Sequence, residues 1–70
     1  MAQRNLGEIV QQLRESRGLT QAQLAERAQL SVSFVSILEG GRSGNNPSLA
    51  IIQRLARALG VSVTKLTEAD

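Results

Sequence analysis

Two short helical segments separated by a tight turn lie at the centre of this 70-residue chain. They fall within residues 20–42, TQAQLAERAQLSVSFVSILEGGR. Thr20 followed by Gln23 is a capping box, which predicts a helix that begins directly after Thr20. Residues 29–31 form the predicted turn, and a second helix is expected over residues 32–39. Two short helices joined this tightly must cross at a steep angle, so the rest of the chain is expected to be the scaffold that holds them.

Close crossing of the two helices needs a small residue on the first helix where the second passes, and Ala25 meets this need. Val35 and Leu38 have the spacing of a buried pair and are expected to anchor the second helix to the first. Leu24 and Leu30 are expected to close the corner between the two helices. The only aromatic residue, Phe34, is expected to be half buried against the first helix of the pair.

Three further helices are predicted around this pair. Apolar residues at helical spacing predict one helix over residues 6–17 and another that ends at Gly60, and a last short helix is expected from Ser62 through Leu66. Gly18 and Gly60 suit the left-handed residue that ends a helix. The residues expected to cap helix starts are Asn5, Ser31, Ser62 and either Asn46 or Ser48, with Pro47 tolerated in the first turn that follows. The apolar stripe expected on the helix before Gly60 consists of Leu49, Ile52, Leu55, Ala56 and Leu59.

The only clear loop is GGRSGNN, residues 40–46, and it is too short to link two domains. A single domain over residues 1–70 is therefore expected. The chain has eight basic and six acidic residues and a net charge of +2. Residues 42–67 contain Arg42, Arg54, Arg57 and Lys65 and no acid. A polyanion would meet a positive field there, although a solvated helix face accounts for the same pattern.

Several function classes are excluded by composition. The chain has no cysteine and no histidine, so it lacks disulfides, the usual zinc ligands and the side chains most used in nucleophilic and acid–base catalysis. Its six acids are scattered along helix faces, which argues against a metal site. We therefore expect no enzyme activity, no metal and no cofactor. The N-terminal residues lack a long apolar run, which predicts no signal peptide and no membrane span.

Four motifs occur in order along the chain: R-x-x-R-G-L-T-Q-x-x-L-A at 14–25, S-x-S-F-V-S-x-L-E-x-G-R at 31–42, N-P-S-L at 46–49 and A-x-A-L-G-V-S-V at 56–63. Together they resemble the helix-turn-helix domain shared by phage repressors, Cro proteins and xenobiotic-response-element-type bacterial regulators. The resemblance implies an all-α, compact five-helix bundle of the lambda-repressor-like type, in which helices 2 and 3 form the helix-turn-helix. The family usually has glycine where this chain has Gln29, so the turn is either strained, at a cost of roughly 1 kcal/mol, or uses another geometry.

The resemblance also implies that helix 3 enters the major groove of double-stranded DNA. The residues expected to face the groove are Val32, Ser33, Ser36 and Ile37. The family commonly has Arg, Lys, Gln, Asn or Thr at such positions, whereas this helix offers no bidentate partner for guanine or adenine. Val32 and Ile37 are expected to pack on thymine methyl groups, and DNA shape is expected to contribute to sequence choice. The alternatives to groove contact are that Val32 and Ile37 form a protein-binding stripe or belong to the core.

Contacts to the DNA backbone and inside the domain are also implied. The residues expected to contact phosphates are Gln21, Arg42, Ser43, Asn45 and Asn46. For each of them an ordinary solvated polar residue is the alternative. Arg14, late in helix 1, and Glu39, at the end of helix 3, are expected to form a structural ion pair that holds helix 3 in register.

One small module buries little surface, so such domains commonly pair on twofold DNA sites. A homodimer is therefore expected, with contacts from Ile51, Val63 and Leu66. The function that follows is a sequence-specific, double-stranded DNA-binding transcriptional regulator, a repressor, of bacterial or phage origin, working in the cytoplasm at the nucleoid. A protein partner is expected to supply any regulatory signal. The alternative is a protein-interaction module of the antitoxin type that uses the apolar face of helix 3. Salt dependence of DNA binding would separate the two.

Overall fold

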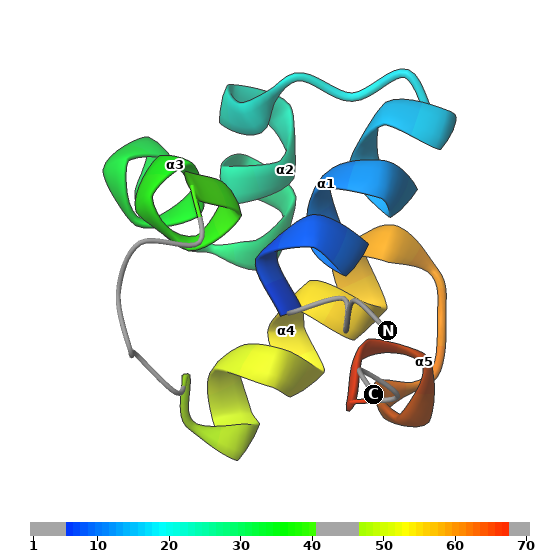
Figure 1. Cartoon of the computed structure of the whole chain (residues 1–70). Helices are drawn as coiled ribbons and strands as arrows, with labels where there is room; N and C mark the ends of the chain where they lie inside the picture. The colour runs from blue at the N-terminus through cyan, green and yellow to red at the C-terminus, as the bar shows by residue number, and fades with distance from the viewer. Residues whose placement is uncertain (1–5, 41–46, 68–70) are drawn as a thin grey trace.

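Helices joined by short turns make up the described part of the chain (Figure 1). The computed structural model describes residues 6–40 and 47–67, and these contain no strand. The helices in chain order are α1 (Leu6–Ser16), α2 (Gln21–Ala28), α3 (Val32–Gly40), α4 (Leu49–Leu59) and α5 (Val63–Thr67). The predicted all-α architecture is confirmed, and the ends of α1, α3 and α5 differ by one residue from the expected ones, as fraying helix ends commonly do. No helix in the described ranges is both long and apolar enough to cross a bilayer.

Local side-chain chemistry begins and ends these helices as predicted. The Thr20 hydroxyl accepts a hydrogen bond from the Gln23 backbone N–H at 3.0 Å, and the Gln23 side chain accepts one from the Thr20 N–H at 2.9 Å. Gly18 and Gly60 follow α1 and α4 with φ angles of 68° and 73°. In this left-handed region glycine avoids the clash that a Cβ atom would cause.

Three serine hydroxyls cap the starts of α3, α4 and α5. The Ser31 hydroxyl accepts a hydrogen bond from the backbone N–H of Phe34 at 3.0 Å. In the same way Ser48 accepts from Ile51 and Ser62 accepts from Lys65, both at 3.3 Å. Since Ser48 is the cap of α4, Pro47 precedes the cap and is not in the first turn, where it was expected. The proposed caps Asn5 and Asn46 lie outside the described residues.

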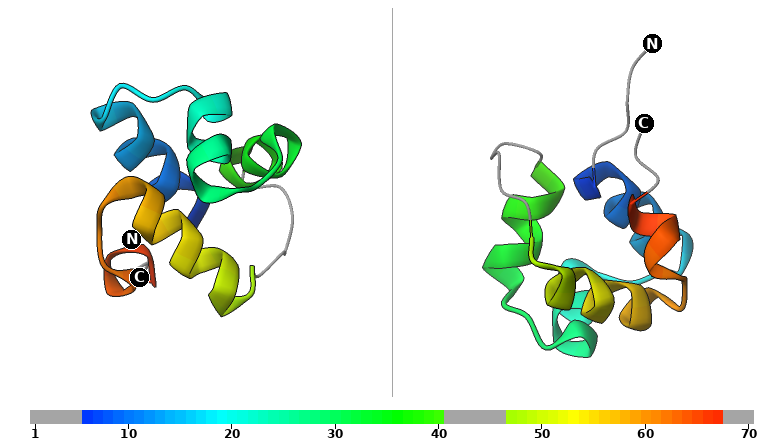
Figure 2. Two further views of the ribbon diagram at one scale, coloured as in Figure 1. Left: turned by 180° about the vertical axis from the view of Figure 1, so that it is seen from behind. Right: turned by 90° about the horizontal axis from the view of Figure 1, so that it is seen from below.

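One hydrophobic core holds the helices together. α1 packs against α3, α4 and α5, while α2 packs against α3 and α4 (Figures 1 and 2). Of the helix-pair residues predicted to be buried, Leu24, Ala25 and Val35 are buried, and Leu30 and Leu38 are half buried. The largest completely buried side chains are those of Leu24, Leu55, Leu59, Leu66, Val10 and Val35. These side chains come from all five helices, so the described elements form a single packed unit.

Leu49 is not part of this core, and the prediction that it belongs to the apolar stripe of α4 is wrong. Its side chain is 61% exposed. The reason is that α4 begins at Leu49, and its first turn extends beyond the other helices (Figure 1). Apolar spacing alone cannot show that the first residue of a helix lies beyond the neighbours that the following residues pack against. The other four stripe residues are buried or half buried.

Candidate nucleic-acid interface

The outward face of α3 is an arc made by two serines flanked by two aliphatic residues. Successive helical residues are rotated by about 100°, which puts Ser33 and Ser36 near the middle of the arc and Val32 and Ile37 at its edges. All four are exposed, and the Val32 and Ile37 side chains are 46% and 52% exposed. Val35 points the other way and is completely buried. The alternative that Val32 and Ile37 belong to the core is therefore excluded.

The turn before α3 places this arc at the surface. Gln29 has φ 59° and ψ 45°, the left-handed conformation that glycine would adopt at lower cost. The backbone N–H groups of Gln29 and Leu30 donate to the carbonyl oxygens of Glu26 and Ala25 at 3.2 and 2.8 Å. Of the two alternatives for this turn, the usual geometry with a strained residue is the one present. The chain changes direction over residues 29–31, and Ser31 caps α3.

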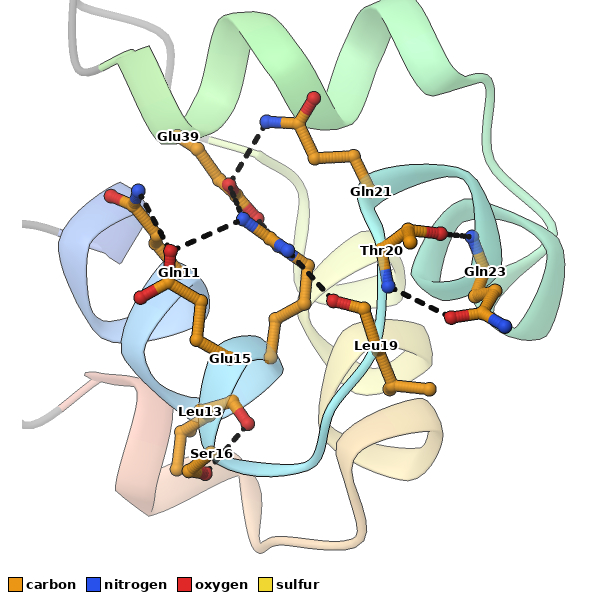
Figure 3. Close-up of polar contacts among 10 residues, drawn as sticks. Gln11, Leu13, Glu15, Ser16, Leu19, Thr20, Gln21, Gln23 and Glu39 are labelled. Atoms are coloured by element: carbon orange, nitrogen blue, oxygen red, sulfur yellow. Dashed lines mark hydrogen bonds and ion pairs between the residues drawn. The ribbon is translucent and has the colours of Figure 1, made fainter.

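The predicted ion pair between Arg14 and Glu39 is present and joins α1 to the end of α3 (Figure 3). Arg14 Nε donates to Glu39 Oε2 at 2.7 Å, and Arg14 Nη2 donates to Glu39 Oε1 at 2.9 Å. The contact is bidentate, which is the stronger geometry for a guanidinium and a carboxylate. Arg14 Nη1 also donates to the Leu19 carbonyl oxygen at 2.7 Å, so one side chain connects α1, α3 and the segment before α2.

The surroundings of Arg14 favour its charged form. The Glu39 side chain is only 3% exposed and that of Arg14 is 11% exposed. Hydrogen bonding to Glu39 raises the pKa of the Arg14 guanidinium above its ordinary value, against the opposing effect of burial. No buried side-chain nitrogen or oxygen within residues 6–40 and 47–67 lacks a hydrogen-bond partner. The charge that closes α3 is therefore fully compensated inside the domain.

Gln21, predicted to contact a phosphate, has a partner within the chain. Its Nε2 donates to Glu39 Oε1 at 3.0 Å (Figure 3). The contact connects the first residue of α2 to the end of α3, so Gln21 joins the Arg14–Glu39 pair. Sequence reasoning missed it because nothing local in the sequence signals a contact between residues eighteen positions apart. One amide hydrogen of Gln21 is left for a second acceptor.

Gly7 is a second residue that sequence reasoning missed. It lies in the first turn of α1, where it is buried against α3. A Cβ atom built there would overlap the carbonyl oxygen of Leu38 and would lie 3.2 Å from Glu39 Cα. The absence of a side chain therefore lets the backbones of α1 and α3 approach closely. A glycine inside an expected helix is the only signal in the sequence, and it does not say which helix approaches.

The remaining predicted site residues fall into two groups. Arg42, Ser43, Asn45 and Asn46 lie outside the described residues. Of the three proposed dimer contacts, Ile51 and Val63 are partly buried and pack against the core. Leu66 is 0% exposed, so the prediction that it contacts a second copy is wrong. Leu66 faces inward because α5 packs on α1 and α4.

Comparison with known proteins agrees with this geometry. A family model described as a helix-turn-helix domain matches residues 5–69. A solved structure of SinR, the master regulator for biofilm formation, in complex with DNA has a TM-score of 0.83 to this chain at 31% identity. It covers 89% of this chain, which in turn covers 97% of that chain.

Two relatives are named as a repressor and as a transcriptional regulator. The immunity repressor protein of Bacillus phage phi105 is 41% identical over 61 residues, which are 87% of this chain and 41% of the relative. The HTH-type transcriptional regulator DdrOP3 of Deinococcus deserti is 44% identical over 63 residues, which are 90% of this chain and 47% of the relative. The chain thus spans somewhat less than half the length of these two relatives. With its two crossed helices, left-handed turn and five-helix lambda-repressor-like fold, the chain belongs to the helix-turn-helix domain family.

Proposed function

We propose that this chain is a sequence-specific, double-stranded DNA-binding transcriptional regulator, a repressor, that inserts α3 into the major groove. The observation that carries the proposal is the exposed arc of Val32, Ser33, Ser36 and Ile37, on a helix that is anchored by the buried Val35 and, at its end, by the Arg14–Glu39 pair. A rigid helix with one free face has the dimensions that the major groove admits. The names of the relatives, a phage immunity repressor among them, support the regulatory role. The site of action would be the bacterial nucleoid, in the cytoplasm.

The chemistry of the arc determines what α3 would read. Neither serine nor aliphatic side chains form the bidentate contacts that identify guanine or adenine. The Val32 and Ile37 side chains suit the C5-methyl group of thymine, which lies in the major groove. The Ser33 and Ser36 hydroxyls would donate to base edges or phosphates. We expect modest direct discrimination, supplemented by the deformability of the DNA.

Contacts to the DNA backbone would come from residues that precede and follow α3 in the sequence. Gln21 stands at the start of α2, where free backbone N–H groups favour an anion. Its bond to Glu39 fixes the side chain and leaves one N–H for a phosphate oxygen. Arg42, Ser43, Asn45 and Asn46, which follow α3 in the sequence, are the other proposed phosphate contacts. Pairing on two half-sites about 34–36 Å apart would supply the area that one module lacks, with Ile51 and Val63 as the remaining proposed contacts between copies.

Selection of bound duplexes from a random pool at moderate salt tests this proposal. We expect a twofold-symmetric motif with thymines in each half-site. Arg42→Ala should weaken binding to all selected sequences nearly equally, while Ile37→Ala should relax the preference at one position. Failure to enrich any motif would contradict sequence-specific binding, and a motif that is unchanged in Ile37→Ala would contradict base reading by α3.

A second candidate is a protein-interaction module of the antitoxin type. The specific observation in its favour is that Val32 and Ile37, about half exposed, give α3 a partly apolar surface. Each phosphate neutralised on duplex DNA contributes roughly 0.9 to the slope of log affinity against log salt. A steep slope supports the DNA-binding proposal. A flat response with every duplex, together with binding of a protein to α3 that Ile37→Ala abolishes, would favour this second candidate.

A further inference from the structure

A recess lies between the end of α2 and the outer side of α4. Its volume is about 350 Å³, within the lower range of ligand pockets. The residues that line it are Arg27, Ala28, Gln29, Ala50, Gln53, Arg54 and Arg57. Of these, only Ala28 is buried. We call this recess the arginine groove.

Three arginines, Arg27, Arg54 and Arg57, line the arginine groove, and its lining contains no acidic residue. Arg54 and Arg57 lie one turn apart on α4, and Arg27 faces them from the last turn of α2. No ion pair or side-chain hydrogen bond connects any of the three to another residue of the described ranges. Three positive charges at one recess without a counter-charge repel one another, so binding of an anion there is favourable.

Helix dipoles account for the positions of two of the three arginines, but not for the placement of all three at one recess. Arg27 and Arg57 each lie in the last turn of a helix, where a positive charge interacts favourably with the helix dipole. Arg54 lies in the middle of α4 and has no such role. The buried residues Leu55, Ala56 and Leu59 use the opposite side of the helix. None of the three arginines therefore has a role in the core.

The arginine groove is separate from the proposed DNA-reading arc. Arg27 is six residues from Gln21, about 9 Å further along α2. Seen from behind, α2 and α4 lie in front and α3 lies at the edge of the molecule (Figure 2). A concave recess of this volume admits the side chains of one extended segment, whereas a rigid duplex is too wide to enter it. These observations favour a peptide over DNA as the occupant.

We propose that the arginine groove binds an acidic segment of a partner protein, one in which carboxylates alternate with small side chains. Charge complementarity carries the argument: guanidinium groups form bidentate hydrogen bonds with carboxylates, and Arg27, Arg54 and Arg57 present three such groups to one recess. Small side chains fit over Ala28 and Ala50, the apolar residues of the lining. This proposal goes beyond DNA binding and does not depend on it, because it uses different residues.

Binding of a fluorescent peptide of alternating glutamate and alanine to the full chain tests the proposal, measured by anisotropy. We expect Arg54→Gln with Arg57→Gln to weaken binding about tenfold, the sum of two modest charged contacts. The matched control for the single Arg54→Gln is Arg17→Gln, which removes the same charge from an exposed site on the segment after α1. The same peptide with glutamine in place of glutamate should not bind. Since all substituted side chains are exposed, thermal melting should confirm that the variants fold.

Four results would overturn the proposal. The first is that the parent does not bind the peptide, and the second is that Arg17→Gln and Arg54→Gln lose peptide affinity equally. The third is self-association of the parent that Arg54→Gln abolishes. The fourth is a smaller slope of log duplex affinity against log salt when Arg54 is replaced. The third would assign the groove to a second copy and the fourth to DNA phosphates. Duplex affinity is measured separately from peptide affinity, so failure of the DNA-binding proposal is distinguishable from failure of this one.

Discussion

Glu39 determines how firmly α3 is held, because its carboxylate is buried at the point where α1, α2 and α3 meet. Both of its oxygens accept hydrogen bonds from Arg14, and one also accepts from Gln21. Burying a carboxylate is costly unless it is paired and hydrogen-bonded. The three donors meet that condition, so removing the carboxylate would leave the mostly buried guanidinium of Arg14 with only the exposed Glu15, 3.8 Å from its Nη2, as a counter-ion.

Glu39→Ala is therefore expected to destabilise the domain by about 3–5 kcal/mol. That is about the whole stability of a domain of this size, so the variant should be largely unfolded at room temperature by circular dichroism. Glu26→Ala, at an exposed site on α2, is the matched control and should melt like the parent. Replacing both charges, Arg14→Met with Glu39→Met, should recover much of the loss. Equal melting of Glu39→Ala and the parent would contradict a stabilising role for the pair.

For Gly7→Ala, helix propensity and packing predict opposite changes in stability. Helix propensity alone predicts that Gly7→Ala stabilises the domain by roughly 0.5–1 kcal/mol. Because the added methyl group would overlap the backbone of Leu38, we expect instead a loss of about 1–3 kcal/mol, the usual cost of overpacking. Urea unfolding measures the sign directly. A more stable Gly7→Ala would show that α1 and α3 separate without cost.

At the scale of the element, the turn between α2 and α3 is the strained part of the motif. Gln29 is the only residue other than glycine with a positive φ among the described residues. Its conformation still forms the hydrogen bonds that end α2, from the Gln29 and Leu30 N–H groups. The left-handed backbone conformation that positions α3 is therefore adopted by Gln29, although glutamine is unfavourable in that conformation.

Gln29→Gly is expected to raise the free energy of unfolding by about 0.5–1 kcal/mol, because glycine adopts this φ without a steric penalty and loses part of that gain through its freer unfolded chain. The matched control is Gln53→Gly in α4, which should lose about 1 kcal/mol, since glycine is unfavourable inside a helix. Urea unfolding of both variants provides the comparison. A destabilised Gln29→Gly would mean that the Gln29 side chain contributes more than its backbone strain costs.

Elements and caps were predictable from the sequence because their signals are local. Thr20 with Gln23 and the two glycines Gly18 and Gly60 act within one helical turn, and their predictions are confirmed. What could not be predicted depends on distant neighbours. Leu49 has the spacing of a core residue but no helix to pack against, and Leu66 is covered completely by the packing of α5.

The Arg14–Glu39 pair was predictable through the family resemblance, not through spacing. Its third member, Gln21, was predicted in a different role and has a partner only because the folded chain brings the ends of α2 and α3 together. Similarly, the sequence contains an acid-free stretch with four basic residues, but only the fold brings Arg54 and Arg57 to face Arg27 across a recess.

At the scale of the whole molecule, two surfaces of different chemistry are separated. The arc on α3 is neutral and partly apolar, with Val32 and Ile37 half exposed. The arginine groove, between α2 and α4, is strongly positive. This division predicts that Arg54 takes no part in base choice, so that replacing Arg54 leaves the DNA motif unchanged. The central claim is that the α3 arc touches bases in the major groove.

Replacing each thymine of the selected duplex with uracil, one at a time, tests that claim most directly, because uracil lacks only the C5-methyl group. Removing a methyl group that packs on Ile37 should weaken binding about fourfold, from the loss of roughly 0.8 kcal/mol of apolar burial. In Ile37→Ala the sensitivity to uracil at that position should disappear, while Leu49→Ala, which shortens an exposed aliphatic side chain outside α3, should keep it. Equal sensitivity of the parent and Ile37→Ala at every thymine would contradict the contact.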